Sequence, residues 1–131
     1  MTQPSLRRIL LAEDEPDIQI IARMALTAVG GFELEICGNG NEVLARVGAF
    51  APDLILLDVM MPGMDGPETL QALRQDAQLS SIPVIFMTAK IQPPEVDYYR
   101  QMGALGVIAK PFDPMSLPAQ VRALWEGRPQ A

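Results

Sequence analysis

The chain has 131 residues, and 49% of them are apolar, which suits a single compact domain with a substantial core. A net charge of −6 without any basic stripe argues against direct contact with nucleic acid, and no apolar run approaches the roughly 18 residues that a membrane span needs. The chain has no histidine and one cysteine, Cys37, which excludes histidine-based catalysis and an internal disulfide.

The chain lacks internal repeats, low-complexity tracts and long linkers, so we expect one domain over residues 1–131. Its core should span about residues 6–126, followed by a tail at 127–131, with no output domain. The N-terminal stretch does not resemble a secretory signal, because its apolar run is short and acids follow at once. We therefore expect a cytoplasmic protein that does not contact a membrane.

Short apolar runs alternate with helix-like segments from one end of the chain to the other. The first run, residues 8–12, precedes a helix framed by Pro16 at its start and a Gly-Gly pair at 30–31 after its end. The second run, residues 32–37, reads FELEIC and alternates in the way that an edge strand does. The apolar residues that recur at helical spacing in the first helix are Ile18, Ala22, Ala25 and Val29.

A second helix is expected to begin near Asn41 and to stop at Gly48. The third run, residues 54–57, is apolar throughout and leads straight into Asp58. The third helix follows Asp65, which we expect to cap its N-terminus. The apolar positions of these two helices are Val43, Leu44, Val47, Leu70 and Leu73.

The last two apolar runs cover residues 84–87 and 105–109. A helix between them starts after Pro94 and ends before Gly103, and a final helix follows the last run. Pro118, near the start of the final helix, predicts an irregular or late first turn. The apolar positions of these helices are Val96, Tyr99, Met102, Leu117, Val121 and Leu124.

Strand–helix alternation repeated five times predicts an α/β protein with a parallel sheet and helices on both of its faces. The near-continuous apolar runs fit strands that are buried on both sides. The run at 32–37 is the exception, so we place the second strand at an edge of the sheet. This placement favours the flavodoxin-like, doubly wound (βα)5 sheet with strand order 2-1-3-4-5.

Polar residues stand where these strands end. Parallel strands present their carboxyl ends at one edge of the sheet, where ligands bind. Three carboxylates at that edge would repel one another, and a hard cation such as Mg2+ with oxygen ligands relieves the repulsion. The first turn reads EDEPD instead of a glycine-rich sequence, which suits a cation better than a bare phosphate. The residues at this edge are Glu13, Asp14, Asp58, Thr88 and Lys110.

Asp58 can act there as a nucleophile as well as a metal ligand. A carboxylate oxygen can attack a phosphoryl group and form an acyl phosphate. The metal and Lys110 would offset the charge on the phosphoryl oxygens, and Thr88 could donate a hydrogen bond to one of them.

Four motifs carry a family resemblance: the acid pair at 13–14, LLDVMMPGMDG around Asp58, VIFMTA around Thr88 and GALGVIAKPF around Lys110. With these motifs in order, the chain resembles the receiver domain of two-component response regulators over about residues 6–125. The resemblance implies a stand-alone, chemotaxis-type receiver with Asp58 as the phosphoacceptor. It also implies that Mg2+ is bound by Glu13, Asp14, Asp58 and the backbone carbonyl of Met60.

The same resemblance assigns Thr88 and Lys110 to binding the phosphoryl group and implies a cis peptide between Lys110 and Pro111. Met60 and Lys90 would flank the site and control the water that hydrolyses an acyl phosphate. A partner histidine kinase or phosphotransfer protein would donate the phosphoryl group. The signal would pass to a downstream protein through the face formed by the fourth helix, fifth strand and fifth helix. Such a protein is not an enzyme beyond its own phosphorylation and slow dephosphorylation.

The chain departs from the family pattern at two positions. Glu13 stands where an aspartate is common, and its longer side chain would reach the metal through water. Val107 stands where the switch residue is usually Tyr or Phe, and its short, stiff side chain cannot copy the swing of an aromatic ring. We therefore expect the conformational change to be muted, or to pass through the loop after Thr88 and the helix that bears Tyr98 and Tyr99.

Three functions remain open on the sequence. The first is a receiver that accepts a phosphoryl group and then signals by protein contact or relays the phosphate. The second is an unphosphorylated protein-interaction module on the same fold, which the intact set of acids, Thr88 and Lys110 disfavours. The third is an aspartate-nucleophile phosphatase, which usually carries a second aspartate two residues after the nucleophile, where this chain has Met60.

Overall fold

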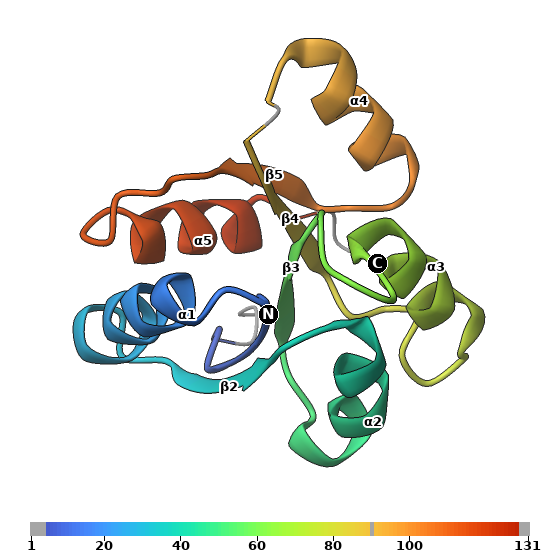
Figure 1. Ribbon diagram of the computed structural model, residues 1–131, viewed down its shortest axis with the longest axis horizontal. Helices are drawn as coiled ribbons and strands as arrows, with labels where there is room; N and C mark the ends of the chain where they lie inside the picture. The colour runs from blue at the N-terminus through green and yellow to red at the C-terminus, as the bar shows by residue number, and fades with distance from the viewer. Residues whose placement is uncertain (1–4, 90, 129–131) are drawn as a thin grey trace.

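The structure, a computed structural model, describes residues 5–89 and 91–128. Five parallel strands form one sheet in the order β2-β1-β3-β4-β5 (Figure 1). This order confirms the predicted flavodoxin-like arrangement, with the alternating strand β2 at an edge. The strands are β1 (Arg8–Ala12), β2 (Glu33–Cys37), β3 (Leu54–Asp58), β4 (Val84–Thr88) and β5 (Gly106–Ala109).

Helices cover both faces of this sheet. The helices α1 and α5 lie on one face, and α2, α3 and α4 lie on the other (Figure 1). Among the described helices, none combines the length and the apolar character needed to cross a lipid bilayer. The helical segments are α1 (Pro16–Arg23), η1 (Met24–Val29), α2 (Gly40–Phe50), α3 (Gly66–Gln75), α4 (Pro93–Gln101) and α5 (Leu117–Glu126).

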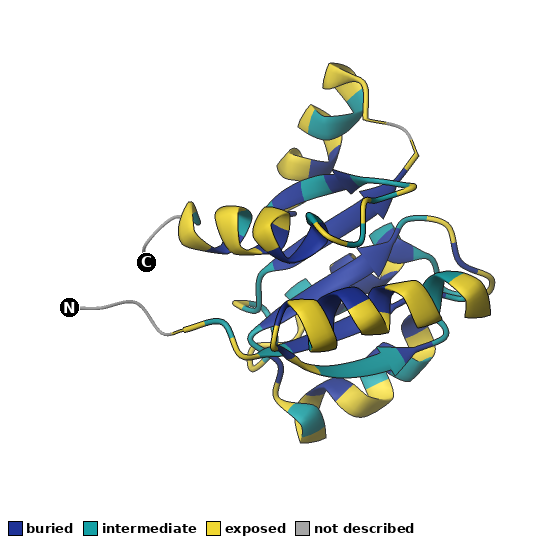
Figure 2. Ribbon diagram, turned by 90° about the vertical axis from the view of Figure 1, so that its left-hand side faces the viewer, coloured by how far each residue is buried: buried dark blue, intermediate teal, exposed yellow. Residues whose placement is uncertain are grey.

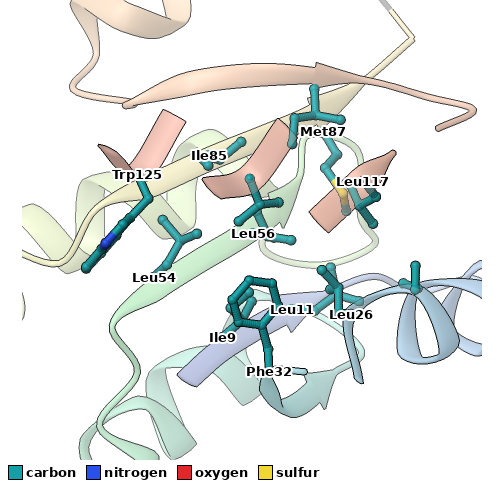
Figure 3. Close-up of a cluster of buried hydrophobic side chains, with 14 residues drawn as sticks. Ile9, Leu11, Leu26, Phe32, Leu54, Leu56, Ile85, Met87, Leu117 and Trp125 are labelled. Atoms are coloured by element: carbon teal, nitrogen blue, oxygen red, sulfur yellow. The ribbon is translucent and has the colours of Figure 1, made fainter. Parts of the chain in front are cut away.

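The hydrophobic core consists of two layers, one on each side of the strands. Figure 2 shows that the strands are mostly buried between helices whose outer faces are exposed, and that the edge strand β2 is only partly buried. All five residues of β3 are buried, since the strand lies at the centre of the sheet with helices on both sides. Figure 3 shows the layer beneath α1 and α5, which includes Ile9, Leu11, Leu26, Phe32, Leu54, Leu56, Ile85, Met87, Leu117 and Trp125.

The first helix differs from its prediction in its second half. It continues beyond Arg23 as a π-helical segment, in which the N–H of Gly30 donates to the carbonyl of Ala25 at 2.9 Å. The wider turn moves Leu26 into the core, where it is fully buried, and leaves Val29 44% exposed. The prediction that Val29 shares the apolar face of the helix is therefore wrong, because that prediction assumed 3.6 residues per turn throughout.

The second helix is also longer than predicted. Asn39 caps it by accepting a hydrogen bond from the N–H of Glu42 at 3.0 Å, and the helix runs through Gly48 to Phe50. It ends where Ala51 adopts a left-handed conformation with φ of 53°. Gly48 therefore does not stop the helix, since a glycine weakens a helix by only about 1 kcal/mol and the packing of the buried Val47 outweighs this cost.

Of the remaining described helices, α3 begins with a side-chain cap, whereas α4 and α5 begin without one and carry proline in the first turn. Asp65 and Glu68 form a reciprocal capping box at the start of α3, which confirms the predicted cap. The helix α5 begins at Leu117, with Pro118 in the first turn, where a missing N–H costs no helical bond. The late start that Pro118 suggested is therefore not observed.

Candidate functional site

The polar residues singled out in the sequence lie at one edge of the sheet. The sheet order places β3 between β1 and β4, so the carboxyl ends of these three strands are neighbours. Glu13 and Asp14 directly follow β1, and Asp58 is the last residue of β3. Thr88 is the last residue of β4 and is buried, and Lys110 directly follows β5. The predicted convergence on one edge is therefore confirmed.

Lys110 joins the acids of two different strands. Its Nζ donates to Oε1 of Glu13 at 2.9 Å and to Oδ2 of Asp58 at 3.0 Å, although these residues lie 97 and 52 positions away in the chain. Glu13 is fully buried and Asp58 is only 5% exposed. The backbone N–H of Lys110 donates to the carbonyl of Thr88 at 3.0 Å, and the Lys110–Pro111 peptide is cis, as expected. The ammonium group is thus held between two buried carboxylates.

The charges of this cluster perturb one another. Burial raises the pKa of Asp58 from 3.8 to about 6, with a further rise from the charge of Glu13 and an opposing effect of the Lys110 hydrogen bond. Burial acts to lower the pKa of Lys110, but the hydrogen bonds to Glu13 and Asp58 outweigh it and raise that pKa. Lys110 therefore stays an ammonium ion, whereas Asp58 can exchange a proton near neutral pH.

Three carboxylates at this edge suit a divalent cation. One ligand oxygen from each of Glu13, Asp14 and Asp58 lies within 4.8 Å of the other two. Carboxylate oxygens at this spacing are the hard donors that Mg2+ prefers, and Asp14 is the most accessible of the three. The set of donors therefore fits the expected metal.

Glu13 is already engaged by protein groups on both of its carboxylate oxygens. Oε1 accepts from Lys110, and Oε2 accepts from the backbone N–H of Glu15 at 3.1 Å. Asp58 has a backbone donor of its own, the N–H of Met60, at 3.4 Å from Oδ1. The side chain of Met60 is 77% exposed, and Lys90 lies outside the described residues.

Two residues that the sequence analysis did not single out also shape the site. A Cβ on Gly66 would lie 2.6 Å from the carbonyl oxygen of Asp58, so only glycine lets α3 approach the end of β3 this closely. Gln19, in α1, donates from Nε2 to the backbone carbonyl of Glu13 at 2.6 Å. The Asp-Gly pair at the start of α3 is a signal that could have indicated the close approach, whereas no local pattern marks Gln19.

Val107, the position at which the sequence analysis expected a switch residue, has apolar neighbours. Val107, in β5, pairs with Phe86 of β4 and is half-buried. The ring of Phe86 meets that of Tyr99 edge-on, with centroids 5.0 Å apart, and Tyr99 in turn contacts Tyr98 at 5.6 Å. A row of aromatic rings thus connects the strand next to Asp58 with α4.

Sequence comparison shows which proteins share these features. Residues 9–122 match the response regulator receiver domain family. The DNA-binding response regulator MtrA of Mycolicibacterium smegmatis is 37% identical over 117 residues, which cover 89% of this chain and 50% of that protein. The response regulator Rre1 of Synechocystis sp. is 36% identical over 116 residues, which cover 88% of this chain and 50% of that protein. The chain spans about half the length of the curated relatives it matches.

Solved structures share the fold over nearly the whole chain. The chemotaxis response regulator CheY4 of Vibrio cholerae superposes with a TM-score of 0.84 at 28% identity, covering 92% of this chain and 99% of that one. The signal receiver domain of a signal transduction histidine kinase from Syntrophus aciditrophicus superposes with a TM-score of 0.79 at 32% identity, covering 95% and 94% of the two chains.

Proposed function

The chain belongs to the response regulator receiver domain family, and from that premise we propose that Asp58 is its phosphoacceptor. One observation carries the proposal: a buried carboxylate ends the central strand with the ammonium group of Lys110 only 3.0 Å away. Burial raises the pKa of Asp58 to about 6, and a perturbed pKa of this kind is typical of a carboxyl group at a functional site.

The proposed reaction transfers a phosphoryl group to Asp58. A carboxylate oxygen of Asp58 forms a bond to phosphorus while the P–N bond of a donor phosphohistidine breaks, and the electron pair of that bond leaves with the donor imidazole. These 131 residues contain no histidine, so the donor histidine lies outside them, and we propose that it belongs to a histidine kinase or a phosphotransfer protein. The product is an acyl phosphate on Asp58.

The chain's own residues stabilise the charge that this transfer brings to the site. Lys110 is positioned to contact a phosphoryl oxygen, since its Nζ already lies beside the attacking carboxylate. Thr88 ends the neighbouring strand, from where its hydroxyl would donate to a second phosphoryl oxygen. These two roles, like that of Asp58, come from matching the family motifs to this chain.

We propose that Mg2+ is bound by Asp14, Asp58 and the backbone carbonyl of Met60. We propose that Glu13, which is fully buried and hydrogen-bonded to Lys110 and to the N–H of Glu15, reaches the ion through a water molecule. When bound, the ion supplies positive charge to the phosphoryl oxygens. The spacing of the three carboxylates supports this assignment.

The output of the domain is proposed to be protein contact. Receiver domains are signalling modules, and we propose that phosphorylation changes the face formed by α4, β5 and α5, where a downstream protein binds. That residues 1–131 form one receiver domain stays a prediction. A turnover limited to its own phosphorylation and slow dephosphorylation is part of the same proposal.

Phosphorylation of the purified chain by a small phosphodonor tests the assignment. With acetyl phosphate and Mg2+, we expect one acid-stable but base-labile phosphoryl group, detected by intact-protein mass spectrometry and mapped to Asp58. The Asp58→Asn variant and the wild type with a chelator should both remain unmodified.

The Asp65→Asn variant is the matched control. It makes the same chemical change at a nearby acid, and asparagine still caps α3, so phosphorylation should proceed as in the wild type. Labelling of Asp58→Asn at the wild-type rate would rule out Asp58 as the acceptor. No labelling of the wild type would favour an unphosphorylated interaction module.

A further inference from the structure

We propose that Gln19 is a positioning residue that holds the acidic loop after β1 in the conformation that binds Mg2+. The proposal rests on the metal site proposed above at Asp14 and Asp58. Gln19 does not contact the metal in this account. It acts through the backbone of the loop that carries Asp14.

The contact is direct and joins two elements. Nε2 of Gln19 donates to the backbone carbonyl of Glu13 at 2.6 Å, from a position one turn inside α1. That carbonyl belongs to the peptide unit that links Glu13 to Asp14. Because a peptide unit is planar, holding its oxygen also fixes the direction in which the main chain enters Asp14.

Other bonds fix the loop before and after this peptide. The N–H of Glu13 donates to the carbonyl of Cys37 at 3.0 Å, which ties the loop to β2. The N–H of Glu15 donates to the side chain of Glu13 at 3.1 Å. Asp14 lies between these anchors and is more exposed than Glu13, so the backbone determines the position of its carboxylate more than core packing does.

The chemical nature of the donor suits its place. The amide of Gln19 is neutral, so it holds the carbonyl without bringing positive charge beside the acids. A lysine or arginine at this position would add a cation close to the carboxylates and compete with Mg2+ for them. A neutral donor fixes the loop and leaves the negative charge of the site for the metal.

The surroundings of Gln19 allow the contact to be tested without unfolding the protein. Its side chain lines an open hollow of about 400 Å³ between α1, the end of β2 and α2. Ile20, Arg23, Ile36 and Glu42 line the same hollow. A side chain of similar length without a donor can therefore be accommodated there.

The test compares Gln19→Met with Gln120→Met. Both substitutions remove a glutamine amide that makes one hydrogen bond, but Gln120, on α5, donates to Ser116 just before that helix, away from the acids. Binding of Mg2+ alone is measured by isothermal titration calorimetry. We expect Gln19→Met to weaken Mg2+ binding about tenfold, because loss of a residue that orients a metal ligand typically lowers metal affinity by this amount. Gln120→Met should leave Mg2+ binding unchanged.

Two further measurements separate positioning from a general structural effect. In metal-free protein, Gln19→Met should shift the amide resonances of Asp14 and Glu15 while thermal unfolding stays close to that of Gln120→Met. With acetyl phosphate, Gln19→Met should need more Mg2+ for half-maximal labelling but reach the wild-type rate at saturating Mg2+. If Gln19→Met fails to fold, the smaller Gln19→Ala variant replaces it.

The outcomes distinguish the proposed role of Gln19 from the proposed Mg2+ site on which it rests. If the wild type binds no Mg2+, the proposed metal site fails. If the wild type binds Mg2+ and Gln19→Met binds it equally well, only the role of Gln19 is overturned. A lower maximal labelling rate at saturating Mg2+ would likewise overturn it, because the loss would then lie in the reaction and not in metal positioning.

Discussion

The acidic edge of the sheet and the α4 side of the domain are built on different interactions. At the acidic edge, Lys110 is hydrogen-bonded to two buried carboxylates from distant parts of the chain. On the α4 side, the short side chain of Val107 and the ring pair of Phe86 and Tyr99 make apolar contacts, while Tyr98 is 59% exposed.

The difference shows which part of the domain can move. Separating one member of a buried ionic cluster from its partners leaves a buried charge uncompensated, which is costly. The side chains of the acidic edge should therefore keep one arrangement. Apolar contacts at a partly exposed helix change by small amounts when side chains shift. We infer that the reaction depends on the first region and the size of the conformational response on the second. Four predictions test this contrast, beginning with the largest effect.

Replacing Lys110 should disrupt the acidic edge most. In Lys110→Met, Glu13 and Asp58 remain buried without their shared cation, so the metal-free protein should lose about 3 kcal/mol of unfolding free energy. Labelling by acetyl phosphate at saturating Mg2+ should fall at least about 100-fold. Urea unfolding and mass spectrometry measure the two effects.

Arg46→Met is the control for this experiment, because Arg46 forms an exposed ion pair with Glu42 at 3.7 Å. Its loss should change stability by less than about 1 kcal/mol and leave labelling unchanged. Equal effects of the two substitutions would contradict the contrast between the buried cluster and surface charges.

Acid should weaken metal binding at the same edge. The pKa of Asp58 is raised to about 6, so below that pH the carboxylate must lose a proton before it binds Mg2+. The affinity should fall about tenfold per pH unit below pH 6 and stay nearly constant above pH 7. Calorimetric titrations at several pH values measure this, and a constant affinity from pH 7 to pH 5 would contradict it.

The same carboxyl should make metal-free stability depend on pH. Its pKa in the folded protein, about 6, lies above the ordinary 3.8, so between these values the folded state binds a proton that the unfolded state has lost. Wild-type stability should therefore fall as the pH rises from about 4 to 6, by an amount on the order of 2 kcal/mol.

Asp58→Asn lacks this titration and serves as the reference for it. The unfolding free energy of the variant relative to wild type should rise across the same pH range. Urea unfolding in the presence of a chelator measures the difference, and parallel pH profiles would show that burial does not raise this pKa.

The smallest effect is expected on the α4 side. In Tyr99→Leu, the contact with Phe86 is lost, which should cost about 1 kcal/mol of stability. The amide shifts that beryllofluoride induces in α4 should shrink, while those next to Asp58 persist. Tyr98→Leu, at the neighbouring exposed position, is the matched control and should retain more of the response.

If the beryllofluoride-induced amide shifts in α4 are unchanged in Tyr99→Leu, the contact between Phe86 and Tyr99 does not couple the phosphorylation site to α4. The absence of any induced shift beyond the immediate site in the wild type would mean that the response is not transmitted through this helix.

The sequence predicted much of this arrangement because its signals were local and repeated. Five apolar runs, one of them alternating, were sufficient for the strand order, and a polar residue at the end of a run could be placed at the binding edge. The capping role of Asp65 followed from residue type and spacing. The π-helical segment η1 and the continuation of α2 beyond Gly48 could not be predicted, because tertiary packing decides both.

By itself, the sequence determined the fold class, the order of the strands and the residues that meet at the acidic edge, since periodicity and strand ends are properties of neighbouring residues. Only the tertiary structure decided how those residues are used. In the folded chain, both carboxylate oxygens of Glu13 accept hydrogen bonds, and Lys110 donates to acids that follow or end two different strands. Gln19 donates to the backbone carbonyl of Glu13. These contacts join residues whose separation along the chain carries no pattern, and they form because burial leaves each charged or polar group in need of a partner.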